Sequence, residues 1–219
     1  FAPFYKVWLC QPRLTPWRFI ALFATVNALV YQAPLWRFVA QHADLTSWEG
    51  WSALLSVELL FGGLTIVVLG LLAVLSRRLL KVVSMVLVLG NALALYFIAS
   101  FHVLLTRAMM GNVFHTDVAE AGALYSGYLL LCVLVLGVLP ALWIYRLQWL
   151  PQSRWRRFWI APTAAVVALG GLYANAHAWL WVDDHAVALG GLAQPWSYVG
   201  NSIRYWQEWK KENTEPALL

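Results

Sequence analysis

Residues 51–75 read WSALLSVELLFGGLTIVVLGLLAVL, and this stretch decides the class of fold. It contains a single charged residue, Glu58, and it exceeds the roughly 18 apolar residues that mark a transmembrane helix. A helix on the surface of a soluble protein keeps one polar face toward water, and no such face is present here. We therefore expect residues 51–75 to cross a membrane as a helix.

Four further stretches share this length and apolarity. The five predicted spans are residues 17–36, 51–75, 82–105, 124–145 and 158–182. Their apolar character is continuous, whereas a membrane-spanning strand alternates over about ten residues, so helices are expected. Tryptophans bracket several of these ends, as Trp17 and Trp36 do for the first span, which suits the level of the lipid headgroups. The predicted fold class is an all-α membrane protein.

The composition agrees with a membrane protein. Hydrophobic residues make up 62% of the chain and charged residues only 11%, with a mean hydropathy of +0.66. Soluble domains carry about 25% charged residues. A water-soluble domain is therefore excluded.

Basic residues flank the predicted spans almost entirely on one side, and this asymmetry predicts the orientation. Those on the favoured side are Lys6, Arg13, Arg18, Arg77, Arg78, Lys81, Arg146, Arg154, Arg156 and Arg157. The connections on the other side contain only Arg37 and Arg107 before the C-terminal tail. Lys and Arg near span ends stay cytoplasmic during insertion. We predict a multi-pass protein of a bacterial inner membrane, with a cytoplasmic N-terminus and a periplasmic tail.

The net charge of +5 at pH 7 follows from the same asymmetry. Because the basic residues form short clusters beside the spans, rather than a groove with stacking aromatic residues, nucleic acid is not an expected partner. Such clusters favour contact with anionic lipid headgroups.

Residues 183–219 form the longest segment outside the predicted spans. This segment is too short for a domain, and its polar end with Pro216 is typical of a linker. Asn201 or Ser202 is expected to cap a short helix that runs through Lys211 on the membrane surface. The predicted organisation is a five-helix transmembrane domain over residues 1–182, followed by a periplasmic linker with an interfacial helix.

The connection between the third and fourth spans has the most distinctive polar pattern. Residues 109–121 read MMGNVFHTDVAEA, in which Asn112, Thr116 and Glu120 recur at every fourth position. A surface helix here would place an amide, a hydroxyl and a carboxylate on one stripe. The stripe suits a zwitterionic headgroup, with the carboxylate on the ammonium and the other two groups on phosphate oxygens. The alternative is structural: Asp117 would cap the next helix, and Glu120 would complete its capping box.

Glu58 is the only acidic residue within a predicted span. Ionisable residues at such depth usually face the bundle interior, a partner or a wet cavity, so Glu58 is a candidate functional residue inside the membrane. The alternative is an uncharged glutamic acid whose hydrogen bonds hold the helices together. Asn27 and Asn91, in the first and third spans, are expected to form hydrogen bonds between helices.

No metal site is expected within this chain. The histidines are His42, His102, His115, His177 and His185, and the cysteines are Cys10 and Cys132. Neither set has the short ligand spacing that is typical of zinc sites.

Several motifs together carry a family resemblance. The run Met-x-x-Asn-Val-Phe-x-Thr-Asp-x-x-Glu-Ala at 109–121 is joined by GVLPA at 137–141, by NAL at 27–29 with Pro34 and Leu35, and by Asn201-Ser202. In this five-span context the chain resembles the N-terminal membrane domain of bacterial phosphoethanolamine transferases, which include the lipid A transferases and the mobile colistin resistance enzymes. One departure is Thr106-Arg107, where family members often carry an acidic residue.

The resemblance implies a metalloenzyme that transfers phosphoethanolamine from phosphatidylethanolamine to lipid A or a related glycolipid, a lipopolysaccharide modification that gives polymyxin resistance. In that family the threonine nucleophile and the zinc ligands lie in a periplasmic catalytic domain after the linker, and these residues are absent from this chain. The resemblance thus implies that this part anchors the enzyme, presents the lipid donor at Asn112, Thr116 and Glu120, and is inactive alone. Its expected partners are membrane lipids, the glycolipid acceptor and its own catalytic domain.

A different class of function stays open from the residues alone. The chain could be an independent small membrane protein, a transporter or a scaffold, in which Glu58 couples an ion.

Overall fold

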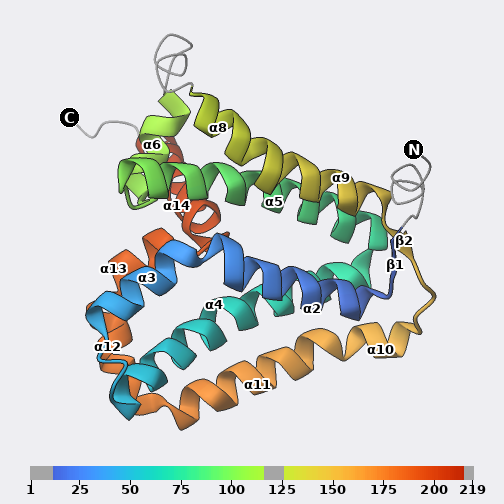
Figure 1. Ribbon diagram of the computed structural model, residues 1–219, viewed down its shortest axis with the longest axis horizontal. Helices are drawn as coiled ribbons and strands as arrows, with labels where there is room; N and C mark the ends of the chain where they lie inside the picture. Colours follow the sequence, from blue (N-terminus) through green and yellow to red (C-terminus); the bar gives the residue numbers. More distant parts are fainter. Residues whose placement is uncertain (1–11, 116–125, 215–219) are drawn as a thin grey trace, which may run out of the picture.

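The computed structural model describes residues 12–115 and 126–214, and nearly all of them are helical (Figure 1). The α-helices are α2 (Pro16–Val26), α3 (Ala33–His42), α4 (Trp48–Leu75), α5 (Arg77–Phe101), α6 (Arg107–His115), α8 (Gly127–Cys132), α9 (Leu139–Arg146), α10 (Arg154–Phe158), α11 (Ile160–Ala174), α12 (Trp179–Asp184), α13 (Ala186–Leu192) and α14 (Trp196–Thr214). Two π-helical segments, Asn27–Tyr31 and Val133–Val138, and one 3-10 turn, Ala176–Ala178, join some of them. The predicted all-α class is confirmed.

Four helical stretches among the described residues are long and apolar enough to cross a membrane. They are α4, α5, the run Gly127–Arg146 and the run Arg154–Ala174. A fifth consists of Pro16–Tyr31 together with α3, two helices that meet at a bend of 59°. The five predicted spans are therefore all found when the bent pair counts as one. The last span ends at Ala174, earlier than the sequence predicts, because the helix breaks at Asn175 before a 3-10 turn.

The bend in the first span has a local cause. The sequence predicts one continuous helix over residues 17–36, but Pro34 has no N–H for the carbonyl of Val30, and its ring displaces that carbonyl. The π-helical segment just before the bend absorbs the change in register. The indole of Trp36 donates a hydrogen bond to the carbonyl of Ala28 (2.6 Å), which ties the two arms together.

A second proline is accommodated by a partner from another span. Pro140 in α9 supplies no N–H to the carbonyl of Leu136, which lies four residues earlier. The hydroxyl of Tyr31 donates to that carbonyl (2.5 Å), and Tyr31 is buried. The first and fourth spans are thus joined at a point where the fourth is internally weakened.

The elements that carry the basic residues of the predicted cytoplasmic side meet at one end of the bundle, at the right of Figure 1. There β1 (Arg13–Leu14) pairs in parallel with β2 (Gln148–Trp149), so the segment before α2 lies against the one after α9. Lys81 donates to the carbonyl of Leu147 (2.9 Å), and Arg157 donates to that of Ala73 (3.1 Å). The connections that the sequence places on one side therefore meet at one end. Lys6 lies outside the described residues.

The opposite end is formed by α3, α6, α12, α13 and α14, at the left of Figure 1. One core cluster packs these helices against α5, with Leu35, Val39, Ile98, Met110 and Leu189 among its members. A second cluster, which includes Phe19, Leu69, Leu80 and Ile144, lies toward the basic end.

The segment between α13 and α14 enters the bundle, which the sequence does not predict. Gln194 is fully buried, and its carbonyl accepts hydrogen bonds from Asn27 Nδ2 (2.8 Å) and Gln32 Nε2 (3.2 Å). Asn91 Nδ2 donates to Asn27 Oδ1 (2.8 Å), and the Tyr198 hydroxyl donates to Asn91 Oδ1 (2.9 Å). The predicted interhelical role of Asn27 and Asn91 is confirmed. Side chains of the first span thus pair with the Gln194 carbonyl, which would be costly to leave unpaired at this depth, and Asn91 of the third span holds Asn27 in place.

Candidate functional site

The sequence-predicted headgroup stripe begins on α6. Thr106 precedes this helix and caps it: its Oγ1 accepts from the backbone N–H of Met109 (3.5 Å), and its carbonyl accepts from that of Met110 (3.0 Å). The predicted helix is found as far as His115, and Asn112 lies on its exposed surface. Thr116 and Glu120 lie outside the described residues, so their place on the stripe stays a prediction.

The connection that leads into α6 is held from two sides. The N–H of Leu105 donates to the carbonyl of Gly191 at the end of α13 (3.1 Å). The carbonyl of Leu105 accepts from Nδ2 of Asn201 in α14 (2.6 Å). One turn later, Met110 is buried in the core cluster at this end. These contacts fix where α6 starts and which of its faces is exposed.

Asn201 therefore has a different role from the predicted one. The sequence suggests that Asn201 or Ser202 caps the tail helix, but α14 already begins at Trp196. Asn201 is inside the helix, and its amide donates both to Leu105 and to the carbonyl of Ser197 (2.9 Å). The cap prediction is wrong because the helix starts where the chain leaves the bundle core, and buried contacts set that point.

Tyr205 of α14 packs against α6, and the two helices lie side by side (Figure 1). Its ring stacks on Phe114, with 5.6 Å between ring centres and 23° between the planes. Gly111 makes this approach possible, since a Cβ there would lie 3.0 Å from Cε2 of Tyr205. The Tyr205 hydroxyl also lies 3.3 Å from Nδ1 of His115. Aromatic contacts of this kind hold α6 with Asn112 outward.

An ion pair adds a third attachment between the same helices. Arg107 at the start of α6 is paired with Glu208 of α14, and both side chains are about half exposed. Exposed pairs of this kind contribute about 0–1 kcal/mol, so this one chiefly sets orientation. It also gives a role to Arg107, the residue at which the chain departs from the acidic pattern of the family that it resembles.

The helix of the fourth span has its own cap. Ser126 precedes α8, and its hydroxyl oxygen accepts from the N–H of Leu129 (3.0 Å). The Tyr96 hydroxyl lies 2.9 Å from the same oxygen. The alternative role of Asp117 and Glu120 as a capping box lies outside the described residues.

Glu58 lies on α4, in another part of the bundle. The main packing partner of α4 is α11, whereas that of α6 is α14, so Glu58 and Asn112 belong to different helix pairs. The Glu58 carboxyl group contacts Gly62: a Cβ on this glycine would lie 2.3 Å from Oε1 of Glu58. Its Oε2 is buried and has no hydrogen-bond partner among the described residues. An ionised carboxylate without a partner is costly inside a membrane, so this geometry favours the uncharged form.

Metal ligands do not converge in residues 12–115 and 126–214. No three His, Cys, Asp or Glu side chains in that part of the chain could hold one ion. His177 Nε2 lies 3.0 Å from Ser52 Oγ, and the rings of His42 and His185 are 5.7 Å apart. The donor set of a zinc centre is therefore not found in the described residues.

Sequence reasoning missed Gln194, Tyr198, Tyr205 and Glu208. The sequence does contain a signal for Gln194. Residues 186–193 form an apolar run that is too short to span a membrane, and Gln194-Pro195 follows it. Apolar runs of this length are typical of buried or re-entrant segments.

Comparisons with known proteins agree with this architecture. A family model described as phosphoethanolamine transferase EptA/EptB matches residues 63–209, a range that includes α6 and most of α14. A curated relative, phosphoethanolamine transferase EptA of Helicobacter pylori, is 31% identical over 185 residues, which is 84% of this chain and 34% of that protein. The chain thus spans about a third of the length of this relative.

A solved structure shares the fold. It is the integral membrane protein lipooligosaccharide phosphoethanolamine transferase A (EptA) of Neisseria meningitidis, with a TM-score of 0.77 at 19% identity, over 95% of this chain and 41% of that one. The match of the family model over residues 63–209 establishes the family, and the curated relative agrees with it. The chain belongs to the phosphoethanolamine transferases of the EptA/EptB type and corresponds to their N-terminal transmembrane domain.

Proposed function

We propose that this domain anchors a phosphoethanolamine transferase in the membrane and presents phosphatidylethanolamine for transfer to lipid A or a related glycolipid. One observation carries the proposal. Asn112 lies exposed on α6. Contacts with α13 and α14 hold the start of this short helix, and a ring contact and an ion pair with α14 hold the rest of it. A surface helix held this firmly is suited to position a ligand. Family membership does not favour an independent transporter or scaffold.

The chemistry of the proposed site follows from its three side chains. The Asn112 amide and the Thr116 hydroxyl donate hydrogen bonds to phosphate oxygens of the lipid headgroup. The Glu120 carboxylate pairs with the ethanolamine ammonium, and this charge-assisted bond distinguishes ethanolamine from uncharged headgroups. The three residues bind and orient the donor, while bond breaking at phosphorus belongs to the catalytic part of the parent enzyme.

The proposed orientation places α6 in the periplasm. The basic end of the bundle faces the cytoplasm from a bacterial inner membrane, because Lys and Arg resist translocation across it. In this proposal the N-terminus is cytoplasmic, and α6 lies at the outer face together with α14, against which it packs. The outer leaflet of that membrane would supply both lipid donor and glycolipid acceptor to the same end of the bundle.

Catalysis requires a further domain in this proposal. The described residues offer no zinc ligand set, so no step of the transfer is assigned to them. The catalytic domain and its zinc would lie within the two thirds of the relative's length that this chain does not cover. Residues 1–219 alone are then inactive, and their partner is that periplasmic domain.

The experiment replaces the proposed headgroup ligands in the full-length parent protein. Asn112→Ala and Glu120→Ala should each abolish the phosphoethanolamine adduct on lipid A, measured by mass spectrometry of extracted lipid. The matched control is Val113→Ala, since Val113 is the next residue of α6 and is 49% exposed. Immunoblots of membrane fractions establish equal expression. Normal lipid A modification in both variants would remove the proposal.

A further inference from the structure

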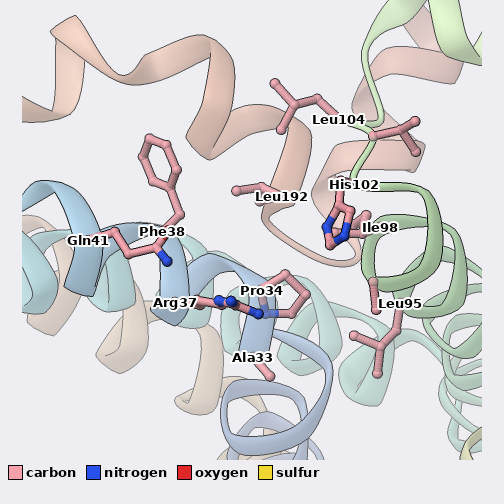
Figure 2. Close-up of a pocket in the computed structure, with 12 residues that line it drawn as sticks. Ala33, Pro34, Arg37, Phe38, Gln41, Leu95, Ile98, His102, Leu104 and Leu192 are labelled. Carbon is pink, nitrogen blue, oxygen red and sulfur yellow. The ribbon is translucent and has the colours of Figure 1, made fainter.

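A cavity of about 510 Å³ lies between α3, the end of α5 and α13 (Figure 2), at the end of the bundle opposite β1 and β2 (Figure 1). Much of its wall is apolar, with Pro34, Leu95, Ile98 and Leu192 lining it. This volume lies within the 300–1,000 Å³ that is usual for small-molecule sites. It is large enough for a headgroup with its nearest carbon atoms, and the apolar wall adjoins the ends of two membrane spans.

Three polar side chains, Arg37, Gln41 and His102, also line the cavity. In Figure 2 the Arg37 guanidinium lies beside Pro34, and the His102 ring lies across from it at the end of α5. Among the described residues, the side chains of Arg37 and His102 form no hydrogen bond or ion pair. Arg107, the other arginine predicted on this side before the tail, is paired with Glu208. Arg37, which is exposed, therefore carries a positive charge without an acidic partner at the edge of a mostly apolar cavity.

The backbone of His102 supports a role for its side chain. This residue ends α5 in the left-handed conformation, with φ 52° and ψ 34°. Glycine is the usual residue at such a helix end, because a side chain there is unfavourable. A histidine at this point keeps an imidazole on the cavity wall at some cost in backbone energy.

The charged residues that line the cavity determine which kind of headgroup it can bind. No Asp or Glu is among the residues that line the cavity, so an ammonium group would have no carboxylate partner there. A phosphate with a net negative charge would instead meet Arg37, whose planar fork suits phosphate oxygens. The headgroup stripe differs, since it includes the carboxylate of Glu120.

We propose that this cavity binds the phosphate of an anionic membrane lipid, with Arg37 and His102 on the phosphate and the lipid's first carbon atoms on the apolar wall. The site is separate from α6 and does not depend on the proposed donor site. It selects lipids without an ammonium group, such as phosphatidylglycerol, over phosphatidylethanolamine.

The test measures lipid binding to the purified full-length protein in detergent, by the rise in unfolding temperature and by lipid adducts in native mass spectrometry. Three additives are compared: phosphatidylglycerol, phosphatidylethanolamine and inorganic phosphate. A ligand that binds only the folded state raises the unfolding temperature in proportion to its affinity. Phosphatidylglycerol should give the largest rise, and inorganic phosphate should give none because it cannot use the apolar wall.

Variants then locate the site. Arg37→Gln should weaken phosphatidylglycerol binding about tenfold, because one charge-assisted contact is lost. Arg204→Gln is the control: it makes the same charge change on an exposed residue of α14 outside the cavity. His102→Asn keeps a residue that tolerates the left-handed conformation and removes the imidazole, so it should also weaken binding. Ala99→Phe should block the cavity without a change of charge, and it carries the test if Arg37→Gln fails to fold.

Equal phosphatidylglycerol binding by the unchanged protein, Arg37→Gln and Ala99→Phe would overturn the site. Equal binding of phosphatidylethanolamine would overturn the charge selection. A rise with inorganic phosphate that matches the lipid would show a free-anion site instead. Loss of donor presentation in the α6 variants, with phosphatidylglycerol binding intact, is expected if the two sites are independent.

Discussion

The side-chain amide of Asn201 lies 2.6 Å from the carbonyl oxygen of Leu105 and donates a hydrogen bond to it. This bond joins α14 to the residue just ahead of the α6 cap. The N–H of Leu105 is bound to Gly191 O, so both backbone groups of this one residue are held by the C-terminal part of the chain. The position of α6, and with it that of Asn112, therefore depends on residues 191–208.

Asn201→Ala should lower the free energy of unfolding by about 1–3 kcal/mol, because a largely buried carbonyl loses its side-chain donor. Lipid A modification by the parent enzyme should fall with it, since α6 loses one fixed point. Chemical or thermal unfolding of the purified protein gives the first quantity. Ser202→Ala, at the neighbouring position, is the control and should change neither. Unfolding curves that coincide for the two variants would contradict this role for Asn201.

Gly111→Ala should disturb α6 more than the small size of the change suggests. The new Cβ would lie 3.0 Å from Cε2 of Tyr205, so the ring or the helix must give way by a few tenths of an ångström. We expect at least a severalfold loss of lipid A modification. Gly200→Ala in α14 is the matched control: a Cβ there meets nothing within 4 Å, and alanine stabilises a helix by about 0.5–1 kcal/mol relative to glycine.

A second variant shows whether the Gly111 effect arises at Tyr205. In the double variant Gly111→Ala with Tyr205→Leu, the smaller side chain makes room for the Cβ, so part of the lost activity should return. Identical activity of the single and double variants would place the defect elsewhere.

Tyr31→Phe should destabilise the bundle by about 1–3 kcal/mol, because the Leu136 carbonyl freed by Pro140 then lacks a donor inside the membrane. Thermal unfolding in detergent measures the change. Tyr173→Phe removes a hydroxyl from a side chain that is 86% exposed and serves as the control. If the two substitutions lower the unfolding temperature equally, the Tyr31 contact does not compensate for Pro140.

Glu58→Gln tests the alternative functions of the intramembrane carboxyl group. Glutamine matches the shape of an uncharged glutamic acid, so a packing role predicts unchanged lipid A modification and nearly unchanged unfolding temperature. Glu58→Ala should be less stable by about 1–3 kcal/mol, through lost packing against Gly62. Loss of activity in Glu58→Gln, with the fold intact, would instead assign Glu58 a role that needs its ionisation.

The spans could be predicted because each depends on a local property of the chain. Residues 51–75 are apolar enough by themselves, and the structure has α4 from Trp48 to Leu75. The bend after Tyr31 was missed because a proline near the end of a span is compatible with either a straight or a bent helix, and the choice depends on packing. The buried Gln194 was missed for a related reason: its partners Asn27 and Gln32 lie far away in the sequence.

The candidate site could likewise be predicted only in part. The predicted fold class includes a surface helix between the third and fourth spans, and α6 is present at Asn112. Its supports, Tyr205 and Glu208, lie in a segment that the sequence describes only as an interfacial helix. No periodicity links residue 111 to residue 205, because a contact between such distant positions is a property of the folded bundle.

Photo-crosslinking of the lipid donor tests the central claim most directly. A phosphatidylethanolamine with a photoreactive group near its phosphate would be added to the full-length protein in membranes, and the modified residues would be found by mass spectrometry. The account predicts labelling within residues 107–120, competed by unlabelled phosphatidylethanolamine and lost in Asn112→Ala with Glu120→Ala. Labelling that the double variant leaves unchanged, or that maps to the α4 region around Glu58, would contradict it.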